Sequence, residues 1–226
     1  MTDSSSLPVH MDARDSDALD RSIEGLSAVR LIGILRGYPP EDAIRAARLA
    51  GDAGLRVLEV TLDSPDAISV IQILSRAESN VTVGAGTVTT AERARTALSA
   101  GARFVVSPTT SIEVIRLCAD SGVPAIPGAA TPTEIHTALD AGASAVKLFP
   151  AEQLGGVDYL RAVRAPLGNP PLVPTGGVTL DNVAGYLKAG AVAVGAGSSM
   201  FSPATPREGT WSELEDLLSR WVGAVT

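Results

Sequence analysis

Lys147 is the residue whose type and position most clearly point to chemistry. It lies in the apolar run Ala145–Phe149, where the two-residue period of a strand places its side chain on the same side as Ala145 and Phe149. Desolvation disfavours a charged ammonium group, and a neutral amine can attack a carbonyl carbon to form a Schiff base. The alternative is a structural lysine that pairs with a carboxylate. The other lysine, Lys188, follows a helical pattern at a place where cations are ordinarily favoured, and we assign it no role.

Glu59 is a second charged residue inside an apolar run. In the stretch Arg56–Thr61 its side chain shares one side of the predicted strand with Val57 and Thr61. A carboxyl group among aliphatic neighbours has a raised pKa, which suits it to passing protons. Schiff-base chemistry needs such a group to make and break the carbinolamine and to move a proton at the enamine carbon. A buried ion pair with Lys147 is the alternative, but the two residues together favour covalent catalysis.

Two glycine-rich turns supply backbone N–H groups of the kind that bind phosphate. They are Thr175-Gly176-Gly177 and Gly195-Ala196-Gly197-Ser198-Ser199. Arg36 can grip a carboxylate or phosphate through two hydrogen bonds, and Thr87 can donate a hydroxyl. Tight turns, a surface ion pair for Arg36 and a helix-start position for Thr87 are the alternatives. These residues predict a small anionic ligand in a local pocket.

A repeated strand–helix pattern must position these residues. Short apolar stretches alternate with helical ones, and we predict strands at Val29–Leu35, Arg56–Thr61, Thr82–Gly86, Phe104–Ser107, Ala125–Gly128, Ala145–Phe149, Leu172–Pro174 and Val192–Gly195. Alternating βα units demand parallel strands, and eight of them close into a (β/α)8 TIM barrel, an α/β fold with its functional groups at the carboxyl ends of the strands. A doubly wound sheet is the runner-up, although no Gly-x-Gly-x-x-Gly loop follows the first strand.

Signals for helix starts and ends fall between the predicted strands. The starts are Ser64-Pro65, Thr89–Glu92, Thr110–Glu113 and Thr131–Glu134, and the ends are Gly54, Gly101, Gly122, Gly142 and Gly190. The last helix is predicted from about Glu208 to Val222, with a core-facing stripe of Trp211, Leu214, Leu217, Leu218 and Trp221. Residues 1–22 are predicted as a flexible N-terminal tail and residues 23–226 as a single barrel domain.

Composition narrows the function classes. The net charge of −7 and the aromatic content of 4% argue against binding to nucleic acid or to an anionic membrane through a basic surface. Two histidines cannot form a multi-histidine metal centre, and we predict neither a metal nor another cofactor. The single cysteine and the lack of a signal peptide, or of an apolar run of roughly 18 residues, predict a cytoplasmic protein.

Six short motifs occur in order between Val29 and Pro203. They are Leu58–Leu62, Gly84–Val88, Ser107-Pro108, Ile126–Gly128, Lys147–Glu152 and Pro174–Val178, of which Lys-Leu-Phe-Pro-Ala-Glu is highly specific. Together they resemble the 2-keto-3-deoxy-6-phosphogluconate (KDPG) aldolase family. The resemblance implies a class I aldolase, usually a homotrimer, that cleaves a phosphorylated 2-keto-3-deoxy acid to pyruvate and glyceraldehyde 3-phosphate.

The resemblance also implies a role for each matching residue. Lys147 matches the Schiff-base lysine and Glu59 the general acid/base. The implied substrate contacts are Arg36 and Thr87 on the anion, Phe149 beside the imine, and a phosphate cradle of Thr175, Gly176, Gly177, Gly197 and Ser198. Gluconate-type members often have Arg where this chain has Asp63. The turn Leu62–Pro65 looks more like the branch that acts on the galactonate epimer, and both C4 epimers stay candidate substrates.

Two other function classes fit the same predicted barrel. A phosphosugar isomerase or epimerase would use acid/base pairs without covalent attachment, and Lys147 within a strand argues against it. A non-catalytic sensor of a phosphorylated ligand would be expected to lack Lys147 or Glu59, and both are present. The expected partners are therefore a small phosphorylated keto acid and pyruvate, with no nucleic acid and no membrane.

Overall fold

The computed structural model describes residues 30–77, 81–201 and 210–226, in which parallel strands alternate with helices. The strands are β1 (Leu31–Leu35), β2 (Val57–Thr61), β3 (Thr82–Gly86), β4 (Val105–Val106), β5 (Ala125–Ile126), β6 (Gly128–Ala129), β7 (Val146–Leu148), β8 (Leu172–Pro174) and β9 (Val194–Ala196). The helices are α2 (Pro40–Asp52), α3 (Ala67–Arg76), α4 (Ala91–Ser99), α5 (Ile112–Asp120), α6 (Pro132–Asp140), α7 (Gly156–Arg164), α8 (Val183–Lys188) and α9 (Trp211–Val225). No helix within these ranges is long and apolar enough to cross a membrane. The predicted tail of residues 1–22 lies outside the described residues.

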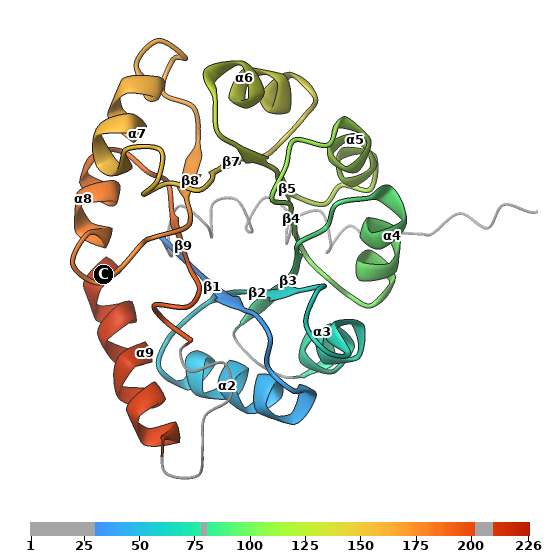
Figure 1. The fold of residues 1–226 in the computed structure, drawn as a ribbon. Coiled ribbons are helices and arrows are strands. Elements are labelled where there is room, and N and C mark those ends of the chain that lie inside the picture. The colour runs from blue at the N-terminus through green and yellow to red at the C-terminus, as the bar shows by residue number, and fades with distance from the viewer. Residues whose placement is uncertain (1–29, 78–80, 202–209) are drawn as a thin grey trace, which may run out of the picture.

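The strands form two parallel sheets that curl around a central space. The larger sheet has the strand order β5-β4-β3-β2-β1-β9, and the smaller one has the order β6-β7-β8. The helices lie on the outer side of the curled sheets (Figure 1). A parallel bridge between Thr175 and Gly195 places the end of β8 beside β9. The chain is thus an α/β protein with curled parallel sheets, as the repeated strand–helix pattern predicts.

The predicted strand Ala125–Gly128 is divided at Pro127. Ala125 and Ile126 pair with β4, whereas Gly128 and Ala129 pair with β7. Pro127 has no N–H group to donate toward β4, and its carbonyl instead accepts a hydrogen bond of 2.9 Å from the backbone N–H of Lys147. The prediction of one continuous strand is therefore wrong. The proline is the residue at which the backbone changes its partner from one sheet to the other.

Two apolar clusters lie on opposite sides of the strands. The outer cluster, which is shared with the helices, includes Leu58, Val60, Val146 and Leu148. The inner cluster consists of Ile32, Val57, Phe104, Val106, Ile126, Ala145, Val173 and Ala193. Glu59 and Lys147 follow Val57 and Ala145 by two residues, so their side chains project to the same inner side. The inner cluster therefore forms an apolar floor beneath these two charged residues.

Helix starts and ends follow the predicted signals with one exception. The side chains of Thr90, Ser111 and Thr131 each accept a hydrogen bond from the backbone N–H three residues later. The glycines predicted to follow helices have positive φ angles, from 66° at Gly122 to 101° at Gly54 and Gly142. Ser64 does not cap a helix, because α3 begins at Ala67. Its hydroxyl instead accepts a hydrogen bond of 2.8 Å from the Gly37 N–H and so connects the loops after β1 and β2.

Helix α9 packs its predicted apolar stripe against the core. Leu214, Leu218 and Trp221 are buried, and the Trp221 indole donates a hydrogen bond of 3.2 Å to the Ser199 carbonyl. The helix continues to Val225, beyond the predicted end. Its predicted start at Glu208 lies outside the described residues. Trp211 and Leu217 are partly buried and pack against the same core, so the stripe is confirmed as core-facing. Through Trp221 it also supports the loop after β9.

Candidate active site

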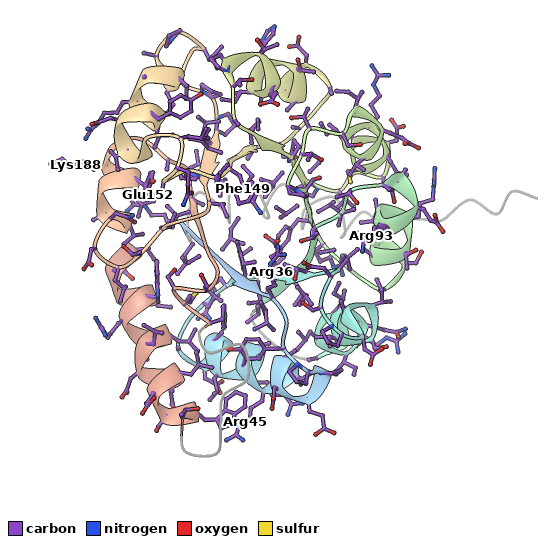
Figure 2. All side chains as sticks on the ribbon, viewed as in Figure 1. Arg36, Arg45, Arg93, Phe149, Glu152 and Lys188 are labelled. Atoms are coloured by element: carbon purple, nitrogen blue, oxygen red, sulfur yellow. The ribbon has the colours of Figure 1, made fainter. Side chains whose placement is uncertain are left out.

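Lys147 and Glu59 are two charged side chains that the strands bury on their inner side. Lys147 lies in β7 between Gly128 of β6 and Val173 of β8, and it is 5% exposed. Glu59 lies in β2 and is 1% exposed. The Nζ atom of Lys147 is 5.2 Å from the centre of the Phe149 ring, and Figure 2 shows Phe149 directed toward the central space. The period-two pattern thus predicted the side of the strand correctly for both charged residues.

The Glu59 carboxyl group occupies a space that exists because residue 86 is glycine. A Cβ atom on Gly86 would lie 1.8 Å from Glu59 Oε1. Among the described residues, Oε1 is buried without a hydrogen-bond partner. Burial raises the pKa of Glu59, the positive charges of Lys147 and Arg36 lower it in part, and the Asp63 carboxylate adds to the rise. A carboxyl group with a raised pKa beside a buried amine can accept and return protons.

Arg36 follows β1, and its guanidinium group holds side chains from the next two strand ends. Nη1 donates to the carboxylate of Asp63, and Nη2 donates a hydrogen bond of 3.0 Å to the Thr87 hydroxyl. The Arg36 side chain is 54% exposed and lies near the middle of the molecule in Figure 2. The structure therefore brings the two predicted anion contacts together. The surface ion pair considered as the alternative for Arg36 is also present, and its partner is Asp63. This partner could not be identified from a local pattern, because the two residues are 27 positions apart in the sequence.

The two glycine-rich turns lie side by side. The Ser199 hydroxyl on the loop after β9 donates a hydrogen bond of 2.6 Å to the Val178 carbonyl on the loop after β8. Gly176 and Gly177 have φ angles of 91° and 80°, which side chains with a Cβ atom rarely adopt. The predicted phosphate residues are thus on two neighbouring loops: Thr175, Gly176 and Gly177 on one, and Gly197 and Ser198 on the other. Ser199 joins the loops, although the sequence suggested only that it belongs to a glycine-rich run.

Arg93 on α4 is a further residue at this end of the strands, and no motif in the sequence pointed to it. Its guanidinium donates to the carbonyls of Leu62 and Thr87, each at 3.4 Å. These hydrogen bonds connect the loops that carry Asp63 and Thr87. Lys188, in contrast, is exposed on α8 and lies at the outer edge of the molecule in Figure 2. Its amine is therefore exposed, whereas the amine of Lys147 is buried on the inner side of the strands.

The site combines a buried amine, a buried carboxyl group and two kinds of hydrogen-bond donor that can bind an anion. An amine on an apolar floor can add to a carbonyl group, and the carboxyl group can move the protons that this addition requires. Guanidinium and backbone N–H groups at the same end of the strands suit a ligand with two anionic ends. Among residues 30–77, 81–201 and 210–226, no group of three His, Cys, Asp or Glu residues could hold a metal ion.

Relatives of this chain are aldolases. The sequence matches the family of KDPG and KHG aldolases over residues 23–217. A 2-dehydro-3-deoxy-phosphogluconate aldolase of Treponema pallidum is 40% identical over 194 residues, which cover 86% of this chain and 92% of that protein. A probable 2-dehydro-3-deoxy-6-phosphogalactonate aldolase of Rhizobium meliloti is 39% identical over 176 residues, which cover 76% and 82%.

A solved structure of similar fold contains a covalent intermediate. It is the KDPG aldolase of Legionella pneumophila with pyruvate captured as a carbinolamine. It matches this structure with a TM-score of 0.77 and 31% sequence identity, over 89% of this chain and 96% of that one. Family match, sequence identity and fold lead to the same assignment. The chain belongs to the KDPG and KHG aldolase family.

Proposed function

We propose that this chain is a class I aldolase that cleaves 2-dehydro-3-deoxy-6-phosphogluconate, or its galactonate C4 epimer, to pyruvate and D-glyceraldehyde 3-phosphate. The observation that carries the proposal is the burial of Lys147 and Glu59 on the same inner side of the strands, above an apolar floor. Membership of the KDPG and KHG aldolase family supports aldol chemistry. The named aldolases of Treponema pallidum and Rhizobium meliloti support the two epimers as candidate substrates.

In the proposed reaction, Lys147 forms and later releases the covalent intermediate. Its amine attacks the C2 carbonyl of the keto acid, and loss of water from the carbinolamine leaves a protonated imine. The imine accepts the electron pair of the C3–C4 bond as that bond breaks, and the C4 hydroxyl loses its proton to become the aldehyde. The enamine then takes a proton at C3, and water hydrolyses the imine to release pyruvate and free Lys147.

Glu59 is the proposed carrier of the protons in this sequence. It accepts the proton of the C4 hydroxyl during cleavage and returns a proton to the enamine carbon. Its raised pKa favours this exchange, since the carboxylate is a stronger base than that of an ordinary glutamate and the acid form persists at higher pH than usual. The space left by Gly86 accommodates the carboxyl group, and its buried Oε1 atom has no hydrogen-bond partner among the described residues.

The two anionic ends of the substrate are proposed to bind at different strand ends. Arg36 and Thr87 are the candidate contacts for the carboxylate, and Phe149 packs beside the imine. The candidate phosphate cradle is formed by Thr175, Gly176, Gly177, Gly197 and Ser198. Binding through such local donors fits a chain whose net charge of −7 would repel an anion.

We further propose that the two curled sheets close into a (β/α)8 barrel and that the protein is a cytoplasmic homotrimer. The bridge between Thr175 and Gly195 supports closure on one side. On the other side only Pro127 separates β5 from β6. The homotrimer rests on the family resemblance, and light scattering of the purified protein would determine the number of subunits.

The substrate proposal is tested by an assay of both C4-epimeric phosphorylated keto-deoxy acids side by side. We expect release of pyruvate from at least one epimer, measured by coupling to lactate dehydrogenase, with a higher kcat/KM for the preferred one. A Lys147→Ala variant is the matched control for background release. No pyruvate from either epimer would contradict the proposed substrate class.

Replacement of Ser198 by Asp tests the phosphate cradle. A carboxylate at this exposed loop position would repel phosphate, so we expect KM for the phosphorylated substrate to rise by about tenfold or more. The pyruvate concentration needed for trapping the imine with borohydride should stay unchanged, because pyruvate has no phosphate. Ser198→Ala, which keeps the backbone N–H, is the control. An equal change in both measurements, or in neither, would remove the loop after β9 from the phosphate site.

A further inference from the structure

Glu152 lies beside the loop proposed to hold phosphate, but its carboxylate is bound by side chains of the neighbouring helix segment. Its Oε2 atom accepts hydrogen bonds from the Tyr186 hydroxyl at 3.0 Å and from the Asn182 amide at 3.4 Å. Figure 2 places Glu152 on the α8 side of Phe149. Tyr186 is fully buried in α8, where burial above all, and then Glu152, raises its pKa, so its hydroxyl stays protonated and donates. The carboxylate therefore has fixed donors on the helix side.

Asn182 connects the Glu152 carboxylate to the glycine loop. Its amide nitrogen also donates a hydrogen bond of 2.9 Å to the Gly177 carbonyl, and its side-chain oxygen accepts one of 2.8 Å from the Thr179 N–H. The backbone N–H of Glu152 donates to the Gly176 carbonyl at 3.0 Å. A Cβ atom on Gly177 would lie 2.3 Å from the Glu152 Cβ atom. Glu152 and Asn182 thus hold the loop through its backbone and pack directly against it.

Two consecutive glycines need such support if they are to bind an anion. Gly176 and Gly177 both have positive φ angles, and glycine loses more conformational freedom than any other residue when it is fixed in one conformation. A donor loop that is already ordered binds its ligand without that loss at the moment of binding. The carbonyls of both glycines are engaged by Glu152 and Asn182, which sets the orientation of the peptide groups next to the proposed phosphate position.

We infer that Glu152 is a positioning residue: its carboxylate, held by Tyr186, orders the Gly176–Gly177 loop through Asn182 and thereby tightens binding of the substrate phosphate. The inference rests on the proposed function, because it assigns phosphate to this loop. Charge alone would give the opposite effect, since a carboxylate near a phosphate repels it. The role of Glu152 is therefore that of a hydrogen-bond acceptor with a packed side chain, and it does not touch the substrate.

The kinetic test compares Glu152→Ala with Glu152→Gln. Gln keeps an acceptor oxygen for Tyr186 and Asn182 but removes the charge, whereas Ala removes both. We expect Glu152→Ala to raise KM for the phosphorylated substrate by about tenfold with a smaller change in kcat, and Glu152→Gln to stay close to the unmodified protein. The pyruvate dependence of imine trapping should be the same in all three. A lower KM in both variants would show that only charge matters and would overturn the inference.

Asn182→Ala tests whether Glu152 acts through the proposed partner. Its KM for the phosphorylated substrate should rise as in Glu152→Ala, and the double variant should be no worse than the more affected single variant, because residues of one network are not additive. Independent, multiplicative effects of the two substitutions would contradict a shared network. Tyr186→Phe removes one hydrogen bond while it keeps the buried ring, so it provides a milder variant if Glu152→Ala does not fold.

Hydrogen exchange separates this inference from the proposed function. The backbone N–H groups of residues 176–179 should exchange faster in Glu152→Ala and Tyr186→Phe, and at the unmodified rate in Glu152→Gln. Exchange in β2 is the internal control for global unfolding. If the unmodified protein neither traps pyruvate nor cleaves the substrate, the proposed function fails, whatever the exchange rates. Unchanged exchange at residues 176–179 in Glu152→Ala would overturn the positioning role even in an active aldolase.

Discussion

Borohydride added together with pyruvate should inactivate the protein and attach one reduced pyruvyl group to Lys147. Hydride reduction converts an imine to a stable secondary amine, whereas a noncovalent complex gives no such adduct. Lys147 is suited to this reaction because it is buried above an apolar floor and points to the inner side of the strands. Intact-mass measurement would show the adduct, and peptide mapping would identify the modified residue.

The second lysine provides the matched control for this experiment. Lys188 is exposed on α8, so Lys188→Ala should trap pyruvate and turn over substrate like the unmodified protein. Lys147→Ala should lose both properties while it retains its circular dichroism spectrum, since removal of a buried amine leaves the apolar packing of its neighbours in place. Modification of Lys188 alone, or of neither lysine, would contradict the class I assignment.

Local patterns in the sequence were sufficient to predict how the strands and these two side chains are oriented. Lys147 and Glu59 each interrupt an apolar run, and the two-residue period placed them with Ala145 and Val57, which the structure finds in the inner cluster. That period is a property of the extended backbone and does not depend on partners. The effect of Pro127 on strand pairing, in contrast, depends on which strands the residues before and after it contact. The division into β5 and β6 therefore could not be derived from the run Ala125–Gly128 alone.

Contacts between strand ends are the part of the site that could not be predicted from the sequence. Asp63 joins Arg36 over 27 positions, and Asn182 joins Glu152 over 30. No local period relates such residues, because the contacts arise from the order in which parallel strands lie in the sheet. Asp63 also shows why they matter: its charge opposes the effect of Arg36 on the pKa of Glu59. The pKa of Glu59 therefore depends on charged residues at several strand ends.

The role of Gly86 in its motif can be seen only in the structure. The sequence Gly84-Ala85-Gly86-Thr87-Val88 indicates Thr87 as a candidate ligand contact and is one of the motifs that resemble the KDPG aldolase family. It does not indicate a role for its glycines. The structure shows the Gly86 backbone against the Glu59 carboxyl group and the Gly84 backbone against the Phe104 ring. Each glycine leaves space for one side chain of the inner side. One of these two side chains is the proposed proton carrier, and the other belongs to its apolar floor.

Replacement of Glu59 by Gln should lower turnover by roughly 10² or more, which is the usual contribution of general acid/base catalysis. Gln fills the same space above Gly86 but cannot exchange a proton. Borohydride trapping of pyruvate on Lys147 should persist at a lower rate, because the amine itself is unchanged. Turnover close to that of the unmodified protein would mean that Glu59 is a structural carboxylate.

Stability as a function of pH distinguishes lost chemistry from a damaged fold in this variant. The pKa of Glu59 is raised in the folded protein, so the folded state holds its proton more strongly than the unfolded chain does. The unmodified protein must therefore lose stability as pH rises from the ordinary Glu value of about 4.3 through the raised folded-state pKa, and Glu59→Gln has no such loss. The urea midpoint of the variant should increase relative to that of the unmodified protein as pH rises above about 4. A variant that is slower yet relatively more stable at higher pH would identify Glu59 as a group whose burial serves catalysis. A midpoint that falls below that of the unmodified protein as pH rises would instead show that its pairing with Lys147 holds the fold together.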